Sequence, residues 1–179
     1  DGARNVSIAV SGAPRGGTLE QIATPAGYTV AFASGTSPST RVSLTLREVS
    51  AFEAMRRVAF AAGYVAVIDR SGLPFATMFM DKSVLEERQP GFVGMYDGAL
   101  MTEEVRAFVE DCDRVLAVGT LASDFNTGAF TARLDPARLI AVGHHHVHID
   151  GRTFAHVELG DVLAALAQKL ARRSWPGVP

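Results

Sequence analysis

The feature that most constrains the fold is the alternation of short apolar runs with amphipathic helical segments after residue 70. The run LPFATMFM (73–80) is almost entirely apolar, which is typical of a strand that is buried on both faces. Two further apolar runs, RVLAVGT (114–120) and RLIAVG (138–143), follow it along the chain. Helical patterns cover 102–112 and 161–173. Strands that alternate with helices in this way predict a parallel sheet.

The two helices of this half have recognisable ends and faces. Thr102 is a suitable N-cap, and the acidic residues after it favour the positive end of the helix dipole. In the second helix, four apolar residues share the face that we expect to point inward: Val162, Leu163, Leu166 and Leu170. We expect 81–100, which is rich in Gly, Pro and charge, to be irregular.

The first half of the chain has a different pattern. Alternation of apolar and polar residues predicts strands, and capping residues mark helices: strands at 6–10, 28–33, 41–49 and 64–69, with helices from Thr18 to about Pro25 and from 51 to 63. Ser50 and Glu53 form a capping box, and Gly63 supplies a helix stop. The predicted inward stripe of the second helix is Phe52, Met55, Ala59 and Ala62. The order β-α-β-β-α-β is that of a split βαβ unit.

The link between the two halves limits how they can combine. Three residues separate 64–69 from Leu73, whereas a parallel crossover needs a dozen or more. A more distant strand such as 7–10 could insert in parallel, or the halves could form separate small layers. We expect an α/β chain with an N-terminal split βαβ (α+β) unit and an incomplete Rossmann-like parallel sheet with flanking helices. The predicted domains are 1–70 and 71–174, followed by a tail, 175–179.

Three strings in the second half carry a family resemblance: FATMFMDKSVLEE, FVGMYDGAL and SDFNTGAFTA, in this order. On these strings, residues of about 72–172 resemble the central domain of thiamine-diphosphate-dependent 2-oxo acid decarboxylases, the pyruvate, indolepyruvate and phenylpyruvate decarboxylase group. The resemblance implies a six-stranded, doubly wound parallel sheet whose first strand lies in the middle. That strand is missing before residue 73, which would leave costly unpaired backbone groups inside the sheet.

The resemblance also bears on chemistry. It implies that thiamine diphosphate and magnesium are held by other domains of the intact enzyme, through a glutamate and a Gly-Asp-Gly stretch that ends in Asn-Asn. Here Gly160-Asp161 lacks the following asparagines. We therefore assign no catalytic, cofactor-binding or metal-binding residue and no cofactor, and we leave open whether the chain is an enzyme. The family's catalytic histidine pair lies in another domain, so His144 and His145 do not inherit that role.

The first half carries a second resemblance, on the strings GTLEQIATPAGYTVAFA and RVSLTLREVSAFEAMRRVAFAAGYVAVID. Residues of about 6–69 resemble the short N-terminal domain of outer-membrane secretins and TonB-dependent receptors. Such domains bind partner proteins in the periplasm and are not catalytic.

Two groups of residues are weighed as ligand sites. His144, His146 and His148 would share one face of a strand and could contribute to a zinc site. The alternative is that these histidines and His145 are solvated or bridge to a neighbouring subunit. The loop after Gly119 holds Asp124, Asn126, Thr127 and Gly128 at the carboxyl end of a strand, where ligands of open sheets bind. Because it lacks arginines and a GxGxxG pattern, we expect this loop to be structural.

Three other features are interpreted as structural. Cys112 lies beside Asp111 and Asp113, which would raise the pKa of its thiol and make it inert. Tyr96-Asp97-Gly98 has the residues of a turn. The charged stretch 81–88 is expected to be a solvated linker or helix.

The preferred function is a non-catalytic scaffold or regulatory segment related to these decarboxylases and joined to a secretin-like module, with a chimera as one explanation of the join. The alternative is a protein-interaction module of bacterial envelope secretion or uptake machinery, and a small zinc protein is a third hypothesis. We expect a protein partner or homo-oligomer. A net charge of −2 and the lack of a long apolar run argue against nucleic acid and membrane insertion.

The origin and location of the chain stay open. The decarboxylase resemblance implies the cytoplasm and the secretin resemblance the periplasm, so the sequence does not choose a compartment. The chain begins at Asp1, so we expect a processed product or an excised piece. A natural fusion, a truncated gene product and an artificial sequence all fit, and neither the parent's 2-oxo acid nor the oligomeric state can be read.

Overall fold

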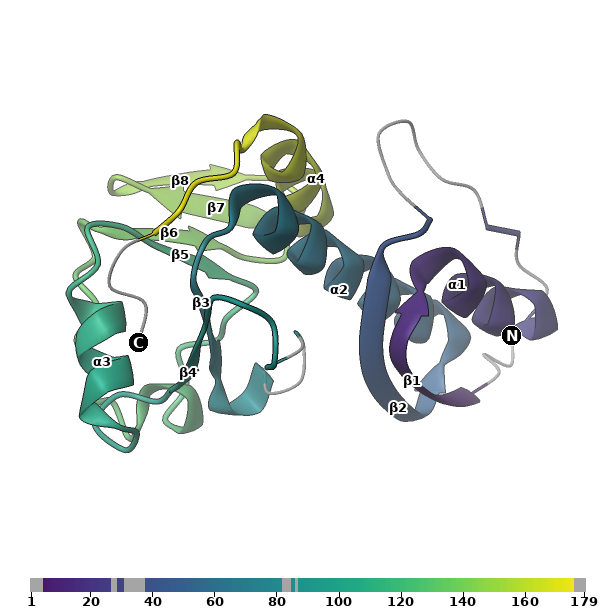
Figure 1. Cartoon of the computed structure of the whole chain (residues 1–179), viewed down its shortest axis with the longest axis horizontal. Coiled ribbons are helices and arrows are strands. Elements are labelled where there is room, and N and C mark those ends of the chain that lie inside the picture. The colour runs from purple at the N-terminus through teal and green to yellow at the C-terminus, as the bar shows by residue number, and fades with distance from the viewer. Residues whose placement is uncertain (1–4, 27–28, 31–37, 82–84, 86, 176–179) are drawn as a thin grey trace.

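The computed structural model describes residues 5–26, 29–30, 38–81, 85 and 87–175. The helices are α1 (Arg15–Ala23), α2 (Ala51–Ser71), α3 (Glu103–Glu110) and α4 (Leu159–Lys169). The strands are β1 (Asn5–Pro14), β2 (Arg41–Ser50), β3 (Phe75–Met78), β4 (Phe92–Tyr96), β5 (Val115–Val118), β6 (Leu139–Val142), β7 (His146–Ile149) and β8 (Arg152–Ala155). Figure 1 shows a smaller lobe with β1, β2 and α1, a larger lobe with β3–β8, and α2 running from one to the other.

The smaller lobe is an antiparallel pair of strands covered by two helices. β1 pairs with β2 from Asn5 opposite Ser50 to Pro14 opposite Arg41, which confirms the strands predicted at 6–10 and 41–49. α1 begins before Thr18, whose hydroxyl donates to the carbonyl of Pro14 instead of capping the helix. The helix ends before Pro25, as predicted. The strand predicted at 28–33 lies largely outside the described residues, and 29–30 are not in a strand. The described part is therefore a two-stranded unit.

The prediction of a strand at 64–69 is wrong, because α2 continues without a break to Ser71. Its start is as predicted: the Ser50 hydroxyl accepts a hydrogen bond from the N–H of Glu53 at 3.2 Å. Its stop lies nine residues beyond the predicted one, at Gly72, which has a φ of 66° and donates its N–H to the carbonyl of Ile68.

Packing explains why Gly63 does not stop the helix. A Cβ at Gly63 would lie 2.9 Å from Cδ1 of Leu163, so the glycine lets α4 approach α2 closely. Gly63 and Gly72 could each end a helix. Because Gly63 packs against Leu163 within the helix, the helix ends at Gly72 instead.

The buried face of α2 also differs from the predicted stripe. The smaller lobe buries the side chains of Ala51, Ala54, Val58, Ala61 and Ala62, together with Leu19, Ile22, Val42 and Leu46. Ala62 is common to both sets, Met55 is partly buried, and Ala59 is exposed. The face follows the spacing i, i+3, i+7, i+10 from Ala51, which is the expected helical repeat in another register.

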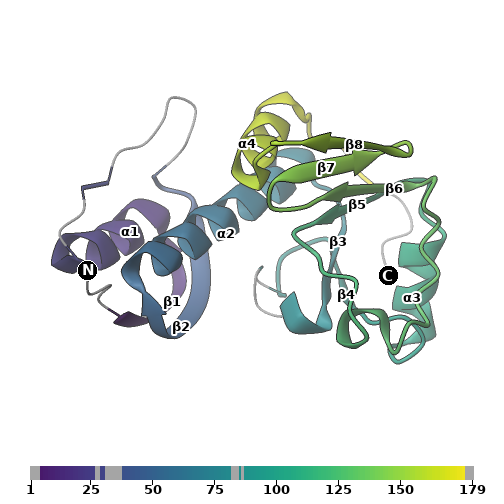
Figure 2. The same cartoon turned by 180° about the vertical axis from the view of Figure 1, so that it is seen from behind.

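The larger lobe contains two separate sheets. β5 pairs with β6 in parallel, in line with the predicted parallel sheet, and β3 pairs in parallel with β4, a strand that was not predicted. β3 and β5 lie in different sheets, so the expectation of one parallel sheet is only partly confirmed. The second sheet continues through β7 and β8, which are antiparallel, to give the order β5-β6-β7-β8. Figure 2 shows these four strands beside α4.

The expectation that 81–100 is irregular is wrong for β4. Gly91 and Gly94 conceal this strand in the sequence, since glycine normally weakens strands. In the structure a Cβ at Gly94 would lie 2.6 Å from Cγ2 of Val105, so the glycine makes room for α3 against the sheet. The hairpin of β7 and β8 was also not predicted.

The larger lobe closes around α2 and α4. Leu163 of α4 is buried in a cluster with Val67 of α2. Val162, Leu166 and Leu170 pack against this cluster, which confirms the predicted inward face of α4. β1 pairs with β2 and does not enter the larger lobe, so the two halves form separate layers. The domain boundary at residue 70 stays a prediction. None of the helices in the described ranges is long and apolar enough to cross a bilayer.

Candidate functional site

The loops that follow the carboxyl ends of β3, β4 and β5 meet at one edge of the larger lobe. We call residues 79–81, 97–100 and 119–131 the carboxyl-edge loops. The first and third contain short 3-10 turns, Phe79–Asp81 and Phe125–Thr127. This is the edge at which open α/β sheets bind ligands, so its side chains are the first candidates for a site.

Asn126 joins the first and third of these loops. Its side chain is 2% exposed. Its Oδ1 accepts a hydrogen bond from the backbone N–H of Met80 at 2.9 Å, and its Nδ2 donates to the carbonyl of Leu121 at 3.0 Å. Both ends of the amide are thus engaged by the protein's own backbone, so Asn126 acts as a structural bridge.

The second and third loops are joined by Gly98, Gly128 and Thr131. A Cβ at Gly128 would overlap the carbonyl oxygen of Asp97, and a Cβ at Gly98 would lie 2.6 Å from the carbonyl oxygen of Thr127. The Thr131 hydroxyl accepts from the N–H of Ala99 at 2.8 Å and donates to the carbonyl of Gly128 at 2.6 Å. The string SDFNTGAFTA therefore specifies a close junction of backbone segments.

The remaining polar groups do not form a site for a diphosphate and its magnesium ion. The Asp124 carboxylate accepts the N–H of Phe125. Asp97 is 5% exposed, and its Oδ1 has no hydrogen-bond partner among the described residues. One buried carboxylate oxygen falls short of the several oxygen ligands that Mg²⁺ requires. Asp161 lies in the first turn of α4, away from these loops in the sequence. The described residues of these loops do not fit the cofactor.

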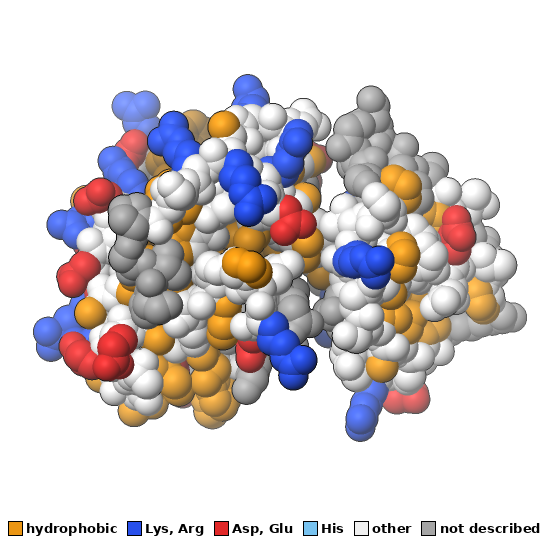
Figure 3. All heavy atoms as spheres, in the orientation of Figure 1, with side chains coloured by type: hydrophobic (Ala, Val, Ile, Leu, Met, Phe, Trp, Pro, Cys, Tyr) orange, Lys and Arg blue, Asp and Glu red, His pale blue; other side chains and the backbone are white. Residues whose placement is uncertain are grey.

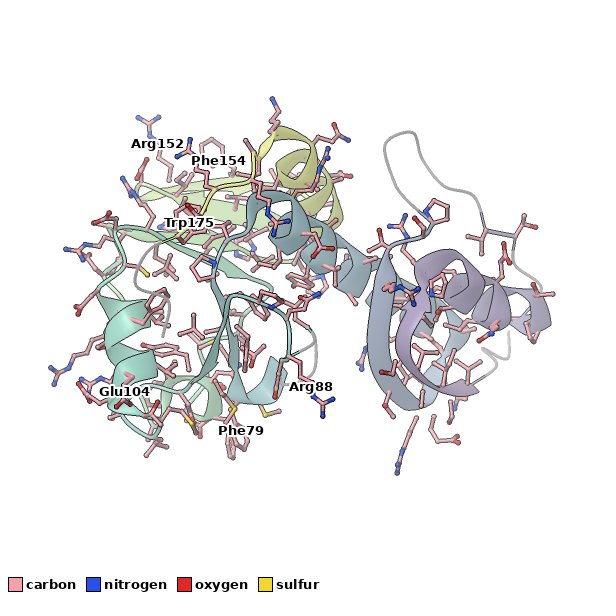
Figure 4. All side chains as sticks on the ribbon, viewed as in Figure 1. Phe79, Arg88, Glu104, Arg152, Phe154 and Trp175 are labelled. Carbon is pink, nitrogen blue, oxygen red and sulfur yellow. The ribbon has the colours of Figure 1, made fainter. Side chains whose placement is uncertain are left out.

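The outer surface of the carboxyl-edge loops is apolar. Besides Leu100 in the second loop, its large exposed apolar side chains are Phe79, Met80, Leu121, Phe125 and Phe130, of which Leu121 and Phe130 are each 72% exposed. Hydrophobic atoms gather at the lower edge of the larger lobe in Figure 3, where Figure 4 labels Phe79. We call these five residues the apolar rim. Contiguous exposed apolar patches are typical of surfaces that bind another protein, a membrane or a ligand.

A partly buried polar network links β4 to α3. The Tyr96 hydroxyl donates to Oε1 of Glu110 at 2.9 Å, and the same oxygen accepts the N–H of Arg133 at 2.9 Å. The Arg106 guanidinium contacts the other oxygen at 3.2 Å. Burial and the Glu110 carboxylate raise the pKa of Tyr96 well above its usual range. Partial desolvation alone would raise the pKa of Glu110, but Arg133, Tyr96 and Arg106 together hold it below its ordinary value.

Glu110→Gln should destabilise the protein by about 1–2 kcal/mol at neutral pH, because hydrogen bonds to a charged group are lost. A carboxyl whose pKa is lowered by folding stabilises the protein above the unfolded pKa, near 4.3, and this contribution is lost as the pH falls through the folded pKa. Urea unfolding between pH 7 and pH 3 should therefore show less acid dependence in Glu110→Gln than in the wild type. Glu104→Gln, at an exposed position of α3, is the control. An unchanged pH dependence would contradict this role.

The interpretation of Cys112 as an inert thiol is supported by its surroundings. Its Sγ lies 3.0 Å from the carbonyl of Phe108, and burial, with smaller effects of Asp113 and Asp111, raises the pKa of the thiol. We expect Cys112 to react with a disulfide reagent at pH 8 several-fold more slowly than free cysteine, and Asp111→Asn/Asp113→Asn to react faster than the wild type. A wild-type rate equal to that of free cysteine would show that the thiol is not protected.

The histidines do not converge. His146 and His148 lie on β7, whereas His144 and His145 precede the strand. Nδ1 of His145 lies 2.7 Å from Oε1 of Glu158, Nδ1 of His148 lies 3.0 Å from Oγ1 of Thr153, and the ring of His144 packs against Phe60. Across the residues that the structure describes, no three metal-ligating side chains form a group that could hold an ion.

Sequence reasoning located the loop that contains Asn126 and Gly128 but not the contacts that these residues make. The structure brings this loop against Asp97-Gly98, where Leu100 donates its N–H to Asp97 in the predicted turn. The apolar rim was missed. A signal was present in three aromatic residues at 79, 125 and 130 that flank polar turn residues.

Comparison with known proteins identifies the family. The thiamine pyrophosphate enzyme, central domain, matches residues 55–170. An alpha-keto-acid decarboxylase of Mycobacterium leprae is 40% identical over 107 residues, which are 60% of this chain and 19% of that protein. One of Mycobacterium avium is 36% identical over 114 residues, 64% of this chain and 20% of that protein. The chain thus spans about a fifth of the length of these curated relatives.

The family match also bears on the first half of the chain. It begins at Met55, inside α2, and no match supports a secretin or TonB-receptor domain in the residues before it. The matched segment includes most of α2, all strands of the larger lobe and the carboxyl-edge loops. By the extent of this match, the chain belongs to the thiamine pyrophosphate enzyme central-domain family.

Proposed function

We propose that this chain is a non-catalytic scaffold or regulatory segment of a thiamine-diphosphate-dependent 2-oxo acid decarboxylase. The observation that carries the proposal is the division of the carboxyl-edge loops into a closed interior and an open surface. Buried Asn126 and the more exposed Thr131 both form hydrogen bonds with the protein's own backbone. Outside, the apolar rim faces solvent, as a surface does when its partner is absent.

The family supports the nature of that partner. The relatives that share this segment are alpha-keto-acid decarboxylases about five times as long as the match. The remaining part of such an enzyme would bind the cofactor and the 2-oxo acid, and the rim would pack against it. The segment then contributes to assembly of the enzyme, and decarboxylation of the 2-oxo acid takes place elsewhere.

A hybrid enzyme tests this proposal. The segment of the M. leprae relative that matches this chain is replaced by the matching residues of this chain, and soluble assembly and release of aldehyde from 2-oxo acids are measured. We expect the hybrid to assemble and retain activity. Phe125→Ser/Phe130→Ser in the hybrid should weaken assembly, whereas Phe154→Ser, at an exposed position outside the rim, should not. A folded hybrid in which the rim substitutions change nothing would contradict the proposal.

A second proposal concerns residues 6–69, as a protein-interaction module of envelope secretion or uptake machinery, joined to the decarboxylase-like segment in a chimera. It rests on the sequence pattern of these residues and on their packing into a lobe of their own, with β1, β2 and α1 around the first half of α2. Immobilised full-length chain should enrich a periplasmic partner, and Arg41→Glu on β2 should reduce that enrichment. No enrichment over a carrier-protein control would count against this proposal.

A further inference from the structure

A second concave site lies where the end of α2 meets the segment that follows α4. A cavity of about 540 Å³ is lined by Gly72, by Pro90-Gly91 and by residues 172–175, which read Arg-Arg-Ser-Trp. This volume falls within the range of about 300–1000 Å³ that is usual for small-molecule sites. Gly72 and Gly91 precede β3 and β4, so the cavity lies at the amino ends of these strands, opposite to the carboxyl-edge loops. We call this cavity the arginine pocket.

The segment that carries the two arginines is held against the end of α2. The N–H of Arg173 donates to the carbonyl of Ser71 at 3.0 Å, and the indole N–H of Trp175 lies 3.5 Å from the same oxygen. A Cβ at Gly72 would lie 2.8 Å from the carbonyl oxygen of Arg173 and 3.6 Å from Cγ of Arg172, so the glycine permits this approach. The backbone therefore positions both side chains before any ligand binds, which lowers the entropic cost of binding.

The charges of Arg172 and Arg173 are not neutralised by the described residues. No acidic side chain of that part of the chain lines the arginine pocket, and neither guanidinium forms an ion pair or hydrogen bond with it. Lys and Arg side chains gather over this region of the larger lobe in Figure 3, near the position at which Figure 4 labels Trp175. The pocket thus has an excess of positive charge.

The end of α2 does not require these two guanidinium groups. The negative end of a helix is often stabilised by basic side chains, which is the structural alternative for both arginines. Here the carbonyl of Ile68 accepts the N–H of Gly72 at 2.8 Å, and the carbonyl of Ser71 accepts the N–H of Arg173. Backbone donors bind these carbonyls, so both guanidinium groups are available to a ligand.

The side chains of the arginine pocket define the chemistry of a ligand. Adjacent arginines bind an anion with several oxygens through paired N–H donors, and a phosphomonoester offers three such oxygens with a charge of about −1.5 to −2. The Ser174 hydroxyl lines the pocket and adds a donor. Trp175 is 39% exposed and gives the pocket a flat apolar wall, against which a ring can pack.

We propose that the arginine pocket binds a small phosphomonoester, with the phosphate held by Arg172 and Arg173 and a flat organic group packed against Trp175. The volume of the pocket suits a small molecule. The site is separate from the apolar rim, and the inference does not depend on the proposed assembly through that surface.

Phenyl phosphate is the probe that tests this inference. Calorimetry of the full chain should show saturable one-to-one binding below millimolar concentration, and the fluorescence of Trp175, the single tryptophan, should change along the same curve. Inorganic phosphate lacks the ring and benzoate lacks the second charge, so each should bind at least about tenfold more weakly. Because the arginines are exposed, raising the salt from about 0.05 M to about 0.5 M should weaken binding several-fold. Equal affinity for benzoate or inorganic phosphate, or no saturable binding of phenyl phosphate, would overturn the proposal.

Variants of the chain test the location of the site. Arg172→Gln/Arg173→Gln should weaken phenyl phosphate binding at least about tenfold, and it preserves the contact with Ser71, which the backbone of Arg173 makes. Arg47→Gln/Arg152→Gln removes the same charge from exposed positions on β2 and β8 and should leave the affinity nearly unchanged. Equal weakening in the two double variants would show a general charge effect and would overturn the proposal.

A further variant separates the contribution of the ring. Trp175→Ala, measured by calorimetry, should weaken phenyl phosphate binding at least about threefold and leave the binding of inorganic phosphate unchanged. The second ligand shows that the arginines keep their place in this variant. An unchanged affinity for phenyl phosphate would contradict the packing of the organic group against Trp175.

Discussion

Replacing Gly128 by alanine should lower the free energy of unfolding by about 3–5 kcal/mol. Gly128 has a φ of 58°, where a side chain strains the backbone by about 1–2 kcal/mol. The larger part of the effect comes from the new Cβ, which would overlap the carbonyl oxygen of Asp97. A backbone atom cannot rotate out of the way, so the second and third carboxyl-edge loops must separate. Urea unfolding followed by circular dichroism measures the change.

Gly151→Ala is the matched control for this experiment. Gly151 has a φ of 73° in the turn between β7 and β8, and a Cβ there would meet no atom within 4 Å. It carries the backbone strain without the overlap, so it should destabilise the protein by about 1–2 kcal/mol. Equal effects of the two substitutions would show that the loop junction at Gly128 is not closely packed.

Val58→Asp should destabilise the smaller lobe by more than about 4 kcal/mol. Val58 is 0% exposed and lies on α2 within the apolar core of that lobe. A carboxylate there would lose its hydration without gaining a partner. Because α2 continues into the larger lobe, we expect the damage to reach the second core, where Val67 packs with Leu163.

The single tryptophan, Trp175, reports whether the two lobes unfold together. Its indole N–H lies 3.5 Å from the carbonyl of Ser71 at the end of α2. We expect Val58→Asp to move the urea midpoint of Trp175 fluorescence to lower denaturant, while Ala59→Asp, one residue away at an exposed position, leaves it nearly unchanged. An unmoved midpoint in Val58→Asp would show that the lobes are independent domains, as the predicted boundary at residue 70 implies.

The sequence was sufficient for the elements whose periodicity is strong. The strands β2, β5 and β6 and the inward face of α4 follow from apolar spacing, and the parallel direction of β5 and β6 agrees with the predicted parallel sheet. The errors occur where a tertiary contact decides between local alternatives. Gly63 and Gly72 are both residues at which a helix can end. The helix continues through Gly63, where Leu163 packs closely, and ends at Gly72.

Glycine also explains why the position of the candidate site could be predicted from the sequence, whereas the contacts within it could not. In the sequence, Gly94 and Gly128 both indicate only that regular structure is disfavoured at that position. In the structure each one admits a neighbour that is distant along the chain, Val105 in one case and Asp97 in the other. No local pattern specifies that neighbour. The three family strings therefore indicated the family to which the loops belong. The hydrogen bonds of Asn126 and Thr131 became known only from the structure.

Calorimetric titration of the full chain with thiamine diphosphate and Mg²⁺ tests the central claim most directly. The claim is that these residues form a scaffold. The polar groups of the carboxyl-edge loops form hydrogen bonds within the fold and do not form a binding site for a diphosphate. We predict no heat of binding up to millimolar cofactor, with the Gly151→Ala variant giving the same result. Saturable micromolar binding of the cofactor by the chain alone would contradict the account.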